Sequence, residues 1–502
     1  MFTTTSVSTK KDLRFTLKSM AAAVALLTSG SAFAAATGGF STTDGGSASG
    51  AQSFTASTYE QINTIIANAK LNASGGKVSG GAYPVIITYT GNEDSLINQV
   101  IADHTVNSSG NCPKPRWNDA YRYVEIKEFT KGITIIGANG SSANFGIVVN
   151  KSSNVIIRNM KIGALAGANN DADMIRIDSG TNVWIDHNEL FAVNNECNGS
   201  PDGDLTFESA IDIKKDSHNI TVSYNLIRDS KKVGLDGSSS SDIAGGREIT
   251  FHHNIYRNVN ARLPLQRGGW THMYNNLYDG ITDSGINVRQ AGYALIESNW
   301  FQNAKNPITC RYDSSNCGFW DLRNNNVRNP GDFATYNITW SSGGTIDATN
   351  WTTTAPFPIS IPYSYAPVTP QCVKDKLASY VGVGKNNAQL TASACGGTTS
   401  SVAAVSSNKS SSSIAASSRS SSSSSASGAP VLGGTGDYPS GFSKCAELGG
   451  TCAVTSGDGW VAFGRKGKWV TKKVTVGSSI ACTVAAFGSE PGGNPNKCSY
   501  KK

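Results

Sequence analysis

The feature that most restricts the fold of this chain is a short pattern that recurs through its middle. The pattern reads apolar, any, apolar, two of any, Asn, any, apolar, and its first copies are "VWIDHNEL", "ITVSYNLI" and "ITFHHNIY". Three more copies follow as "THMYNNLY", "ALIESNWF" and "WDLRNNNV", and "VIIRNMKI" precedes them with Met160 in place of the asparagine. Alternating apolar residues predict a strand. An asparagine at a fixed strand end predicts a turn that is left-handed or bonded by a side chain.

The spacing of these asparagines predicts a solenoid. Their positions are 188, 225, 254, 276, 299 and 325, so the intervals between them are 37, 29, 22, 23 and 26. So short a period, with unequal insertions, leaves no room for alternating strand and helix. It suits rungs of two or three short strands with variable loops on one side. We therefore predict an all-β fold, a right-handed parallel β-helix with a ladder of stacked asparagines inside.

A β-sandwich is the rival fold, but it favours antiparallel hairpins with Asn-Gly or Asp-Gly turns, and these are scarce in the sequence. Helical periodicity is weak except in "TYEQINTIIANAK", residues 58–70. Because an uncovered terminal rung invites association between strand edges, we predict that this segment is a helix that caps the coil.

Each asparagine turn is followed by a second apolar-any-apolar strand. These strands are Ile175-Arg176-Ile177, Ile211-Asp212-Ile213, Val233-Gly234-Leu235, Leu263-Pro264-Leu265 and Ile286-Asn287-Val288. If the apolar residues point inward, the residues before and between them point outward. Lys232 and Arg262 then occupy the same outward position in consecutive rungs, and Asp212 lies one rung earlier. Because neighbouring strands lie about 4.8 Å apart, these side chains are expected to form one cluster.

Further carboxylates flank the two earliest of these strands. They are Asp171, Asp173 and Glu208. Isolated acids or arginines are more often ordinary solvated surface groups, but here they align over successive rungs. A set of acids without cysteine or histidine is typical of a site for a hard cation, Ca²⁺ rather than Zn²⁺.

Longer stretches around these residues resemble a known family. "NVWIDHNELF", "ESAIDIKK", "KKVGLDGSSSSD", "ARLPLQRGG" and "NVRQAGYALIESNWFQNAKNP" are similar to the pectate lyases of polysaccharide lyase family 1. The resemblance spans about residues 40–396 and implies an extracellular β-helix enzyme that acts on polygalacturonate (pectate) in plant cell walls.

The resemblance also implies a role for each matching residue. Arg262 matches the catalytic base, and Lys232 and Arg267 match residues that bind the substrate carboxylate. The ligands of the cofactor, Ca²⁺, match Asp171, Asp173, Glu208 and Asp212. The implied reaction is β-elimination, which removes the C5 proton of a galacturonate and leaves a 4,5-unsaturated product. Because a free guanidinium titrates above about 12, an arginine base leads us to expect an alkaline pH optimum.

Several other functions remain open. A pectin lyase acts on methylated pectin without calcium, and the four acids speak against it. A galacturonan hydrolase needs paired carboxylic acids that activate water. A non-catalytic pectin-binding β-helix has little reason to keep the lysine and arginines together. We do not expect a histidine base, because the repeat contains the histidines at 187, 252, 253 and 272 and the pair Asp186-His187, where packing roles are more common.

The N-terminus and the cysteines indicate secretion. Residues 1–36 combine a basic start, the apolar run "MAAAVALLTSGSAFA" and a small-residue cleavage site, as in a signal peptide, and no other segment is apolar enough to span a membrane. Ten cysteines suit an oxidising compartment. Pairing of nearest cysteines is our default. The resemblance implies Cys112–Cys197 and Cys372–Cys395 as family disulfides. Cys310 and Cys317 depart from the family pattern, and we expect them to form an extra bridge.

The C-terminal part differs in composition. Residues 397–436 form a serine-rich linker, and 437–502 form a small cysteine-containing module with Trp460, Trp469 and "GRKGKWVTKK". The β-helix domain is placed at 37–396. The module carries 9 basic and 4 acidic residues, whereas residues 35–396 carry 28 and 31. Basicity therefore does not indicate nucleic-acid binding. We expect a monomer, with a module that binds carbohydrate or aids solubility.

Overall fold

The computed structural model describes residues 37–113, 121–167, 172–197, 206–243, 247–311, 316–341, 346–385, 387–396, 437–439, 441–456, 459–466, 468–487 and 496–501. The chain divides into two compact units, residues 1–407 and 408–502. The predicted signal peptide, the serine-rich linker and Asp171 lie outside the described residues. Within the described part, no helix is both long and apolar enough to cross a membrane.

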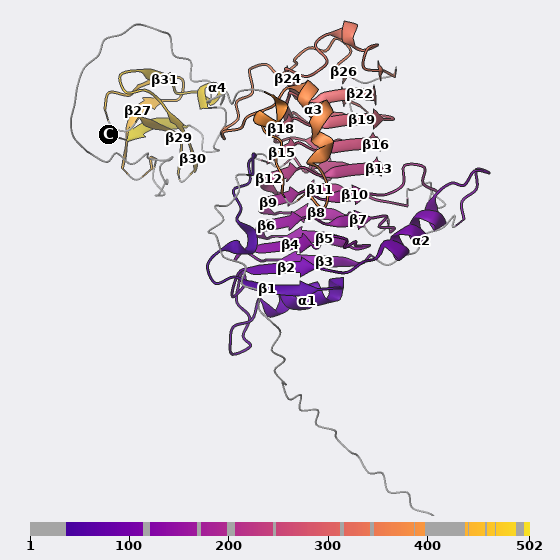
Figure 1. Cartoon of the computed structure of the whole chain (residues 1–502). Helices are drawn as coiled ribbons and strands as arrows, with labels where there is room; N and C mark the ends of the chain where they lie inside the picture. Colours follow the sequence, from indigo (N-terminus) through magenta and orange to yellow (C-terminus); the bar gives the residue numbers. More distant parts are fainter. Residues whose placement is uncertain are drawn as a thin grey trace, which may run out of the picture. The chain divides into compact units, whose positions relative to one another are not determined.

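The strands of the first unit form three sheets that run the length of a coil (Figure 1). The first sheet contains β1 (Gln52–Ala56), β2 (Val85–Tyr89), β4 (Ile133–Gly137), β6 (Ser153–Arg158), β9 (Thr181–Asp186), β12 (His218–Ser223), β15 (Glu248–His252), β18 (Trp270–Tyr274), β21 (Tyr293–Glu297) and β24 (Phe319–Arg323). The second contains β7 (Lys161–Gly163), β10 (Glu189–Phe191), β13 (Leu226–Lys232), β16 (Ile255–Ala261), β19 (Leu277–Ile281), β22 (Trp300–Lys305) and β25 (Ile338–Thr339). The third contains β3 (Tyr123–Lys127), β5 (Gly146–Asn150), β8 (Ile175–Asp178), β11 (Ile211–Lys214), β14 (Gly234–Asp236), β17 (Leu265–Arg267), β20 (Ile286–Arg289), β23 (Ile308–Cys310) and β26 (Ile346–Asp347).

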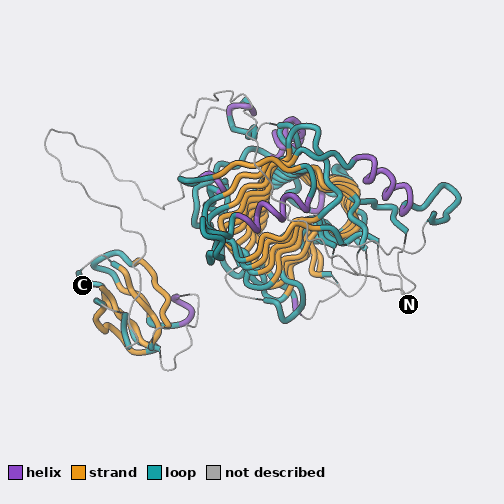
Figure 2. The backbone as a smooth tube through the Cα atoms, turned by 90° about the horizontal axis from the view of Figure 1, so that it is seen from below, coloured by secondary structure: helices purple, strands orange, loops and turns teal. Residues whose placement is uncertain are grey.

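The order of these strands confirms the predicted right-handed parallel β-helix. From β5 onward the chain visits the third, first and second sheets in turn, so each circuit adds one rung. Every described pairing within the three sheets is parallel except that of β23 with β26. Figure 2 looks into the coil from one end and shows the strands of successive rungs lying over one another.

The interior of the coil is filled by aligned apolar side chains. In β4, Ile133 and Ile135 are fully buried, whereas Thr134 is partly exposed, as period-two alternation requires. Ile135 is aligned with an isoleucine of each neighbouring rung, and these stacked residues, Ile87, Ile135, Ile157 and Ile185, are all fully buried. Burial of each such side chain contributes about 1.5–3 kcal/mol to folding.

The predicted asparagine ladder is confirmed. Its six members are buried, and Oδ1 of each of the five after Asn188 accepts from the backbone N–H and Nδ2 of the asparagine before it, at 2.8–3.2 Å. Met160 occupies the first position, and its backbone N–H donates to Asn188 Oδ1 at 2.9 Å. The left-handed residue of each turn is the one before the ladder position, with φ between 50° and 54°: Asn159, His187, Tyr224, His253, Asn275, Ser298 and Asn324.

Asn254→Ala tests the ladder. The Asn254 side chain accepts from Asn225 and donates to Val222 O and Asn276 Oδ1, so its loss leaves buried polar groups without partners. We expect the free energy of unfolding to fall by about 3 kcal/mol, measured by urea denaturation. Asn68→Ala, at an exposed position at the end of α1, is the control. Equal effects of the two substitutions would contradict the ladder's contribution.

A helix covers the first rung, as predicted. α1 (Tyr59–Asn68) begins after Thr58, whose side chain accepts from the Gln61 N–H, and buries Ile62 and Ile66 against the core. Asn63 bonds the free edge of β3: its Nδ2 donates to Tyr123 O and its Oδ1 accepts from Glu125 N–H, both at 2.9 Å. The edge that would otherwise pair with another chain is therefore occupied.

Among the described residues of the first unit, the other helices are α2 (Asp94–His104), α3 (Pro370–Lys376) and the 3₁₀ helices Gly45–Ser47, Pro330–Asp332, Leu377–Ser379 and Ser393–Cys395. Three disulfides join parts of the first unit: Cys112–Cys197, Cys310–Cys317 and Cys372–Cys395.

The second unit is a small antiparallel β module. Its strands are β27 (Phe442–Glu447), β28 (Thr451–Ala453), β29 (Trp460–Arg465), β30 (Lys468–Lys473), β31 (Ser479–Ala481) and β32 (Lys497–Lys501), with α4 (Val484–Phe487). They form a four-stranded sheet in the order β27-β32-β29-β30 and a pair, β28-β31. Two disulfides, Cys445–Cys452 and Cys482–Cys498, staple this unit, which agrees with the predicted disulfide-stapled β fold.

Candidate active site

Three cationic residues singled out in the sequence line one pocket of 380 Å³ beside the third sheet. Lys232 is the last residue of β13, Arg262 directly follows β16, and Arg267 is the last residue of β17. Lys231 and Arg289 line the same pocket. The coil therefore gathers cationic side chains from three successive rungs that lie far apart along the chain.

The predicted alignment of Lys232 with Arg262 is off by one residue. Lys232 faces Ala261, whereas Leu235 faces Leu265, so the register between the two rungs shifts by one between these pairs. The extra residue falls in the segment 262–264, which begins with Arg262 at φ 69°. A left-handed backbone at an arginine is uncommon and is held only where the surrounding structure requires it. Arg262 thus occupies a constrained bulge at the pocket rather than a regular strand position.

The inward and outward positions of β14 also differ from the sequence alignment. Asp212 faces Leu235, and Ile213 faces Asp236, because Gly234 rather than Val233 faces Ile211. A Cβ at position 234 would lie 2.1 Å from Ile211 O, so only glycine allows this close pairing. The consequence is that an acid, Asp236, takes the inward position and is 1 % exposed.

Burial raises the pKa of Asp236 to about 8, and the negative charge of Asp212 adds to this although Arg247 opposes it. The folded state therefore keeps the proton up to about pH 8, whereas the unfolded chain loses it near 3.9. Between these values the folded state binds more protons, so its stability falls as pH rises. We expect Asp236→Asn, which cannot titrate, to gain stability relative to wild type between about pH 5 and pH 9. Urea denaturation at both pH values checks this, and a pH-independent difference would contradict it.

Two of the predicted metal ligands meet at a lysine. Lys214 Nζ lies 3.1 Å from Asp173 Oδ2 and 2.9 Å from Asp212 Oδ2, and both acids are 1 % exposed. Their other oxygens accept backbone N–H groups, Ser209 for Asp173 and Leu235 for Asp212. Burial, followed by the charge of Asp212, raises the pKa of Asp173 well above its usual range. The two carboxyls thus share a buried place that favours a cation.

Glu208, the third described acid, forms an ion pair with Lys232 of the cationic pocket. Its Oε1 lies 2.5 Å from Lys232 Nζ. Burial raises the pKa of Glu208, while the Lys232 ammonium lowers it. Glu208 therefore links the acids to the pocket. No group of three His, Cys, Asp or Glu side chains among the described residues lies close enough to hold a metal ion, and Asp171 lies outside that part of the chain.

The loop after β14 holds Arg267 in place. Arg267 Nη1 donates to Gly237 O at 2.7 Å. The buried Arg247 donates from Nη1 to Arg267 O at 3.0 Å and from Nη2 to Asp242 O and Oδ1 at 2.8 and 3.0 Å. A Cβ at position 237 would lie 2.7 Å from Arg247 Nη1, so glycine at this position makes room for Arg247.

Three cations of the site, Lys214, Lys231 and Arg289, were missed in the sequence. Lys214 lies two residues after Asp212 on the same strand and so shares its face, which the alternation could have indicated. Arg289 faces Arg267 in the next rung and follows the strand Ile286-Asn287-Val288 directly. It lies within the motif "NVRQAGYALIESNWF", so the resemblance contained it without a role.

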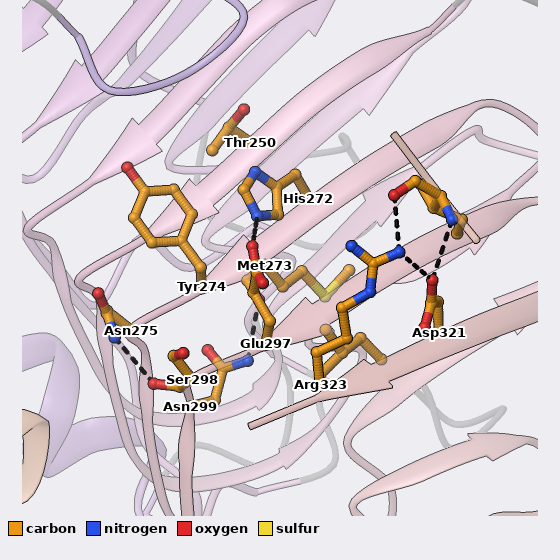
Figure 3. Close-up of polar contacts among 12 residues, drawn as sticks. Thr250, His272, Met273, Tyr274, Asn275, Glu297, Ser298, Asn299, Asp321 and Arg323 are labelled. Atoms are coloured by element: carbon orange, nitrogen blue, oxygen red, sulfur yellow. Dashed lines mark hydrogen bonds and ion pairs between the residues drawn. The ribbon is translucent and has the colours of Figure 1, made fainter. Parts of the chain in front are cut away.

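A second polar cluster lies on the first sheet and is structural (Figure 3). His272 is fully buried, with Nε2 2.8 Å from Glu297 Oε1 and Nδ1 2.6 Å from the Tyr363 hydroxyl. Arg323 Nη2 donates to Asp321 Oδ2 and to Ile359 O. These contacts fasten the segment 359–365 over strands β18, β21 and β24. The cluster supplies no exposed acid or base.

The other histidines of the repeat are also buried. His187 Nδ1 lies 2.8 Å from Asp186 Oδ2, and its Nε2 lies 3.0 Å from Ala388 O, so this pair has no free face. Burial lowers the pKa of His252 to about 4. None of the four histidines in the repeat is among the residues that line the cationic pocket.

Comparisons with known proteins agree on one family. The family model described as "Pectate lyase" matches residues 13–386. The chain is 60% identical to pectate lyase 3 of Pectobacterium atrosepticum over 385 residues, which cover 76% of this chain and 100% of that protein. It is 60% identical over 378 residues to pectate lyase B of Dickeya chrysanthemi, covering 75% and 98% of the two chains.

Solved structures give the same result for the fold. Pectate lyase C from Erwinia chrysanthemi, determined at pH 9.5 with 30 mM Ca²⁺, is 59% identical, covers 71% of this chain and 99% of its own, and superimposes with a TM-score of 0.68. A mutant of pectate lyase C in complex with pentagalacturonic acid has the same identity and TM-score and covers 72% and 99% of the two chains.

Proposed function

This chain belongs to the pectate lyase family, and we propose that it is a secreted, calcium-dependent enzyme that cleaves α-1,4-polygalacturonate by β-elimination. The observation that carries the proposal is the pocket in which Lys232, Arg262 and Arg267 converge beside the buried acids Asp173 and Asp212. A polymer with one carboxylate per sugar finds there a concentration of positive charge in a body whose net charge, over residues 35–396, is −3.

Lys232 and Arg267 are suited to bind the carboxylate of the reacting galacturonate. Lys232 offers a point charge, and Arg267 presents donors in a fixed plane while Gly237 O holds one of its nitrogens. Arg289 and Lys231 line the same pocket and extend the positive charge to the carboxylates of neighbouring sugars. Neutralising the carboxylate makes the adjacent C5 proton more acidic and stabilises the negative charge that develops as it leaves.

Arg262 is the proposed base. In its neutral form it takes the C5 proton. The electrons of that bond form the C4–C5 double bond, and the glycosidic oxygen leaves C4 and takes a proton from solvent. The constrained bulge supports this role, because it fixes the guanidinium at the pocket instead of leaving it on a flexible surface strand. Because the base must be deprotonated, we propose an alkaline optimum.

Calcium fits the acids of this site. Asp173 and Asp212 offer only oxygen donors, are buried together, and already share one cation, the Lys214 ammonium. We propose that they hold Ca²⁺ with Glu208 and Asp171, the last of which lies outside the described residues. When bound, Ca²⁺ would supply charge neutralisation and electrophilic stabilisation of the substrate carboxylate.

We propose the following organisation of the chain: a signal peptide at 1–36, the catalytic β-helix at 37–396, a linker at 397–436 and an accessory module at 437–502. The proposed enzyme acts outside the cell as a monomer. The three disulfides of the β-helix unit support an oxidising destination.

One assay tests the reaction and separates it from its rivals. With polygalacturonate and Ca²⁺ we expect new absorbance near 235 nm from the unsaturated product, and little with highly methylated pectin. A hydrolase gives reducing ends without that absorbance. A pectin lyase prefers the methylated polymer, and a non-catalytic binder releases nothing. Reducing ends without absorbance, or activity on methylated pectin alone, would overturn the proposal.

A further inference from the structure

The second unit lies beyond the residues that the family model matches, so the family match does not assign it a function. Its four-stranded sheet has two different faces. One face carries the apolar core, in which Val461, Phe463, Cys498 and Tyr500 are buried. α4 closes this side, and Phe487 stacks on Phe463 with ring centroids 5.1 Å apart.

The other face carries two tryptophans and a lysine. The register of β29 and β30 sets Trp460 opposite Lys473 and Gly464 opposite Trp469, with Ala462 opposite Thr471 between them. Because residues opposite each other or two apart share a face, Trp460, Trp469 and Lys473 lie together on the side away from the core. We call these three residues the indole–lysine face. Both tryptophans are half-buried, and Lys473 is exposed.

The spacing along this face suits an extended ligand. Trp460 and the Gly464 that faces Trp469 are four residues apart on β29, which corresponds to about 13 Å along the strand. Ala462, which is opposite Thr471, lies between the two indoles. A ligand that crosses from one indole to the other must therefore be an elongated molecule rather than a single small one.

The charge of the unit indicates the sign of that ligand. Residues 437–502 contain 9 basic and 4 acidic residues. The described acids are already paired, Asp437 with Arg465 and Lys497, and Glu447 with Lys444. Lys473 Nζ lies 5.6 Å from the centroid of the Trp460 ring, so a single unit of a bound polymer can contact both side chains.

We propose that the indole–lysine face binds a stretch of acidic polysaccharide, polygalacturonate. The apolar C–H face of a sugar ring packs against an indole, and the carboxylate of the same sugar pairs with the ammonium of Lys473. The choice of this polymer rests on the proposed function of the β-helix unit. The binding itself needs neither calcium nor turnover, and this allows the two proposals to fail separately.

The experiment uses the full chain carrying Arg262→Ala and Arg267→Ala, so that the catalytic pocket neither cleaves the polymer nor dominates its binding. Binding to soluble polygalacturonate in excess EDTA is measured by calorimetry. We expect Trp460→Ala combined with Trp469→Ala to raise the Kd by about tenfold or more, since tryptophan is enriched among the residues that contribute most to binding. Lys473→Gln should raise the Kd less and reduce its dependence on salt.

Val484→Ala is the matched control. Val484 is a 38 % exposed apolar residue on α4, on the core side of the sheet, and its loss should leave the Kd unchanged. Trp460→Phe with Trp469→Phe keeps an aromatic ring at each position and should restore part of the affinity. Retention of both disulfides of the unit, together with wild-type resistance of residues 437–502 to limited proteolysis, shows that the substitutions have not unfolded it.

A second readout uses the enzyme with its catalytic residues intact. The double tryptophan variant should act on short oligogalacturonates at the wild-type rate and lose several-fold activity on insoluble cell-wall pectate. An unchanged Kd for polygalacturonate would overturn the inference. So would tryptophan-dependent binding to cellulose or fully methylated pectin that equals or exceeds binding to polygalacturonate, because the ligand would then be a neutral polymer. Absence of lyase activity with intact binding would instead refute the proposed function alone.

Discussion

Replacing Arg262 with alanine is expected to lower kcat on polygalacturonate by about 10²–10⁴-fold, the usual contribution of a positioned base. Arg262 lines the pocket together with Lys232 and Arg267. These two residues are still present in the variant and can still bind the substrate. KM should therefore change much less than kcat. Initial rates from absorbance near 235 nm, measured over a range of substrate concentrations, give both quantities.

A control for this substitution lies on the same strand. Arg257 belongs to β16 and is exposed on the second sheet, five residues before Arg262, so Arg257→Ala removes the same charge outside the pocket. We expect it to keep wild-type kcat. Far-ultraviolet circular dichroism of both variants should be that of the wild type. A kcat for Arg262→Ala within a few-fold of wild type would exclude Arg262 as the base.

Removal of calcium is expected to abolish activity, and Asp212→Asn is expected to raise the Ca²⁺ concentration for half-maximal rate by more than about tenfold. The reason for the magnitude is that even partners outside the ligand shell change metal affinity by about 10–100-fold when lost. Asn keeps the acceptor for the Leu235 N–H and the volume of the side chain, while it removes the charge that Asp212 shares with Asp173 around a cation.

Asp375→Ala is the control for the calcium experiment. Asp375 is an exposed acid on α3, so its loss should leave the Ca²⁺ dependence unchanged. Activity is titrated with Ca²⁺ after treatment with EDTA. Wild-type rates in excess chelator, or equal Ca²⁺ requirements for the two variants, would contradict a calcium site at these acids.

The register between rungs could not be predicted from the sequence at two places, the segment 262–264 and Gly234. Strand alternation has a period of two, so one bulged residue reverses which side chains point inward. Such a residue lies in the segment 262–264 and shifts the register of the rungs by one. Gly234 acts in the same way, because the absence of a side chain lets it pair with Ile211 and moves Asp236 into the interior. Pro264 and Gly234 are local signs of an irregular strand, but neither sets the direction in which the register shifts.

The β-helix and its asparagine ladder, by contrast, could be predicted from the sequence alone. Each rung needs an apolar strand that ends in a turn with a buried amide side chain. The asparagines therefore mark the rungs in the sequence, even before the contacts between rungs are known. The capping helix could be predicted for a similar reason, because its amphipathic period and its N-cap, Thr58, are local features.

The repeating architecture, the family and the residue types of the site could therefore be predicted from the amino-acid sequence, because these depend on patterns within one rung or one motif. The relation between rungs emerged only from the folded coil. The coil places Lys232 opposite Ala261, Lys214 between Asp173 and Asp212, and Asp236 in the interior. These placements depend on register, which is set by the packing and backbone pairing of neighbouring rungs, and a single bulge or glycine changes register by one residue.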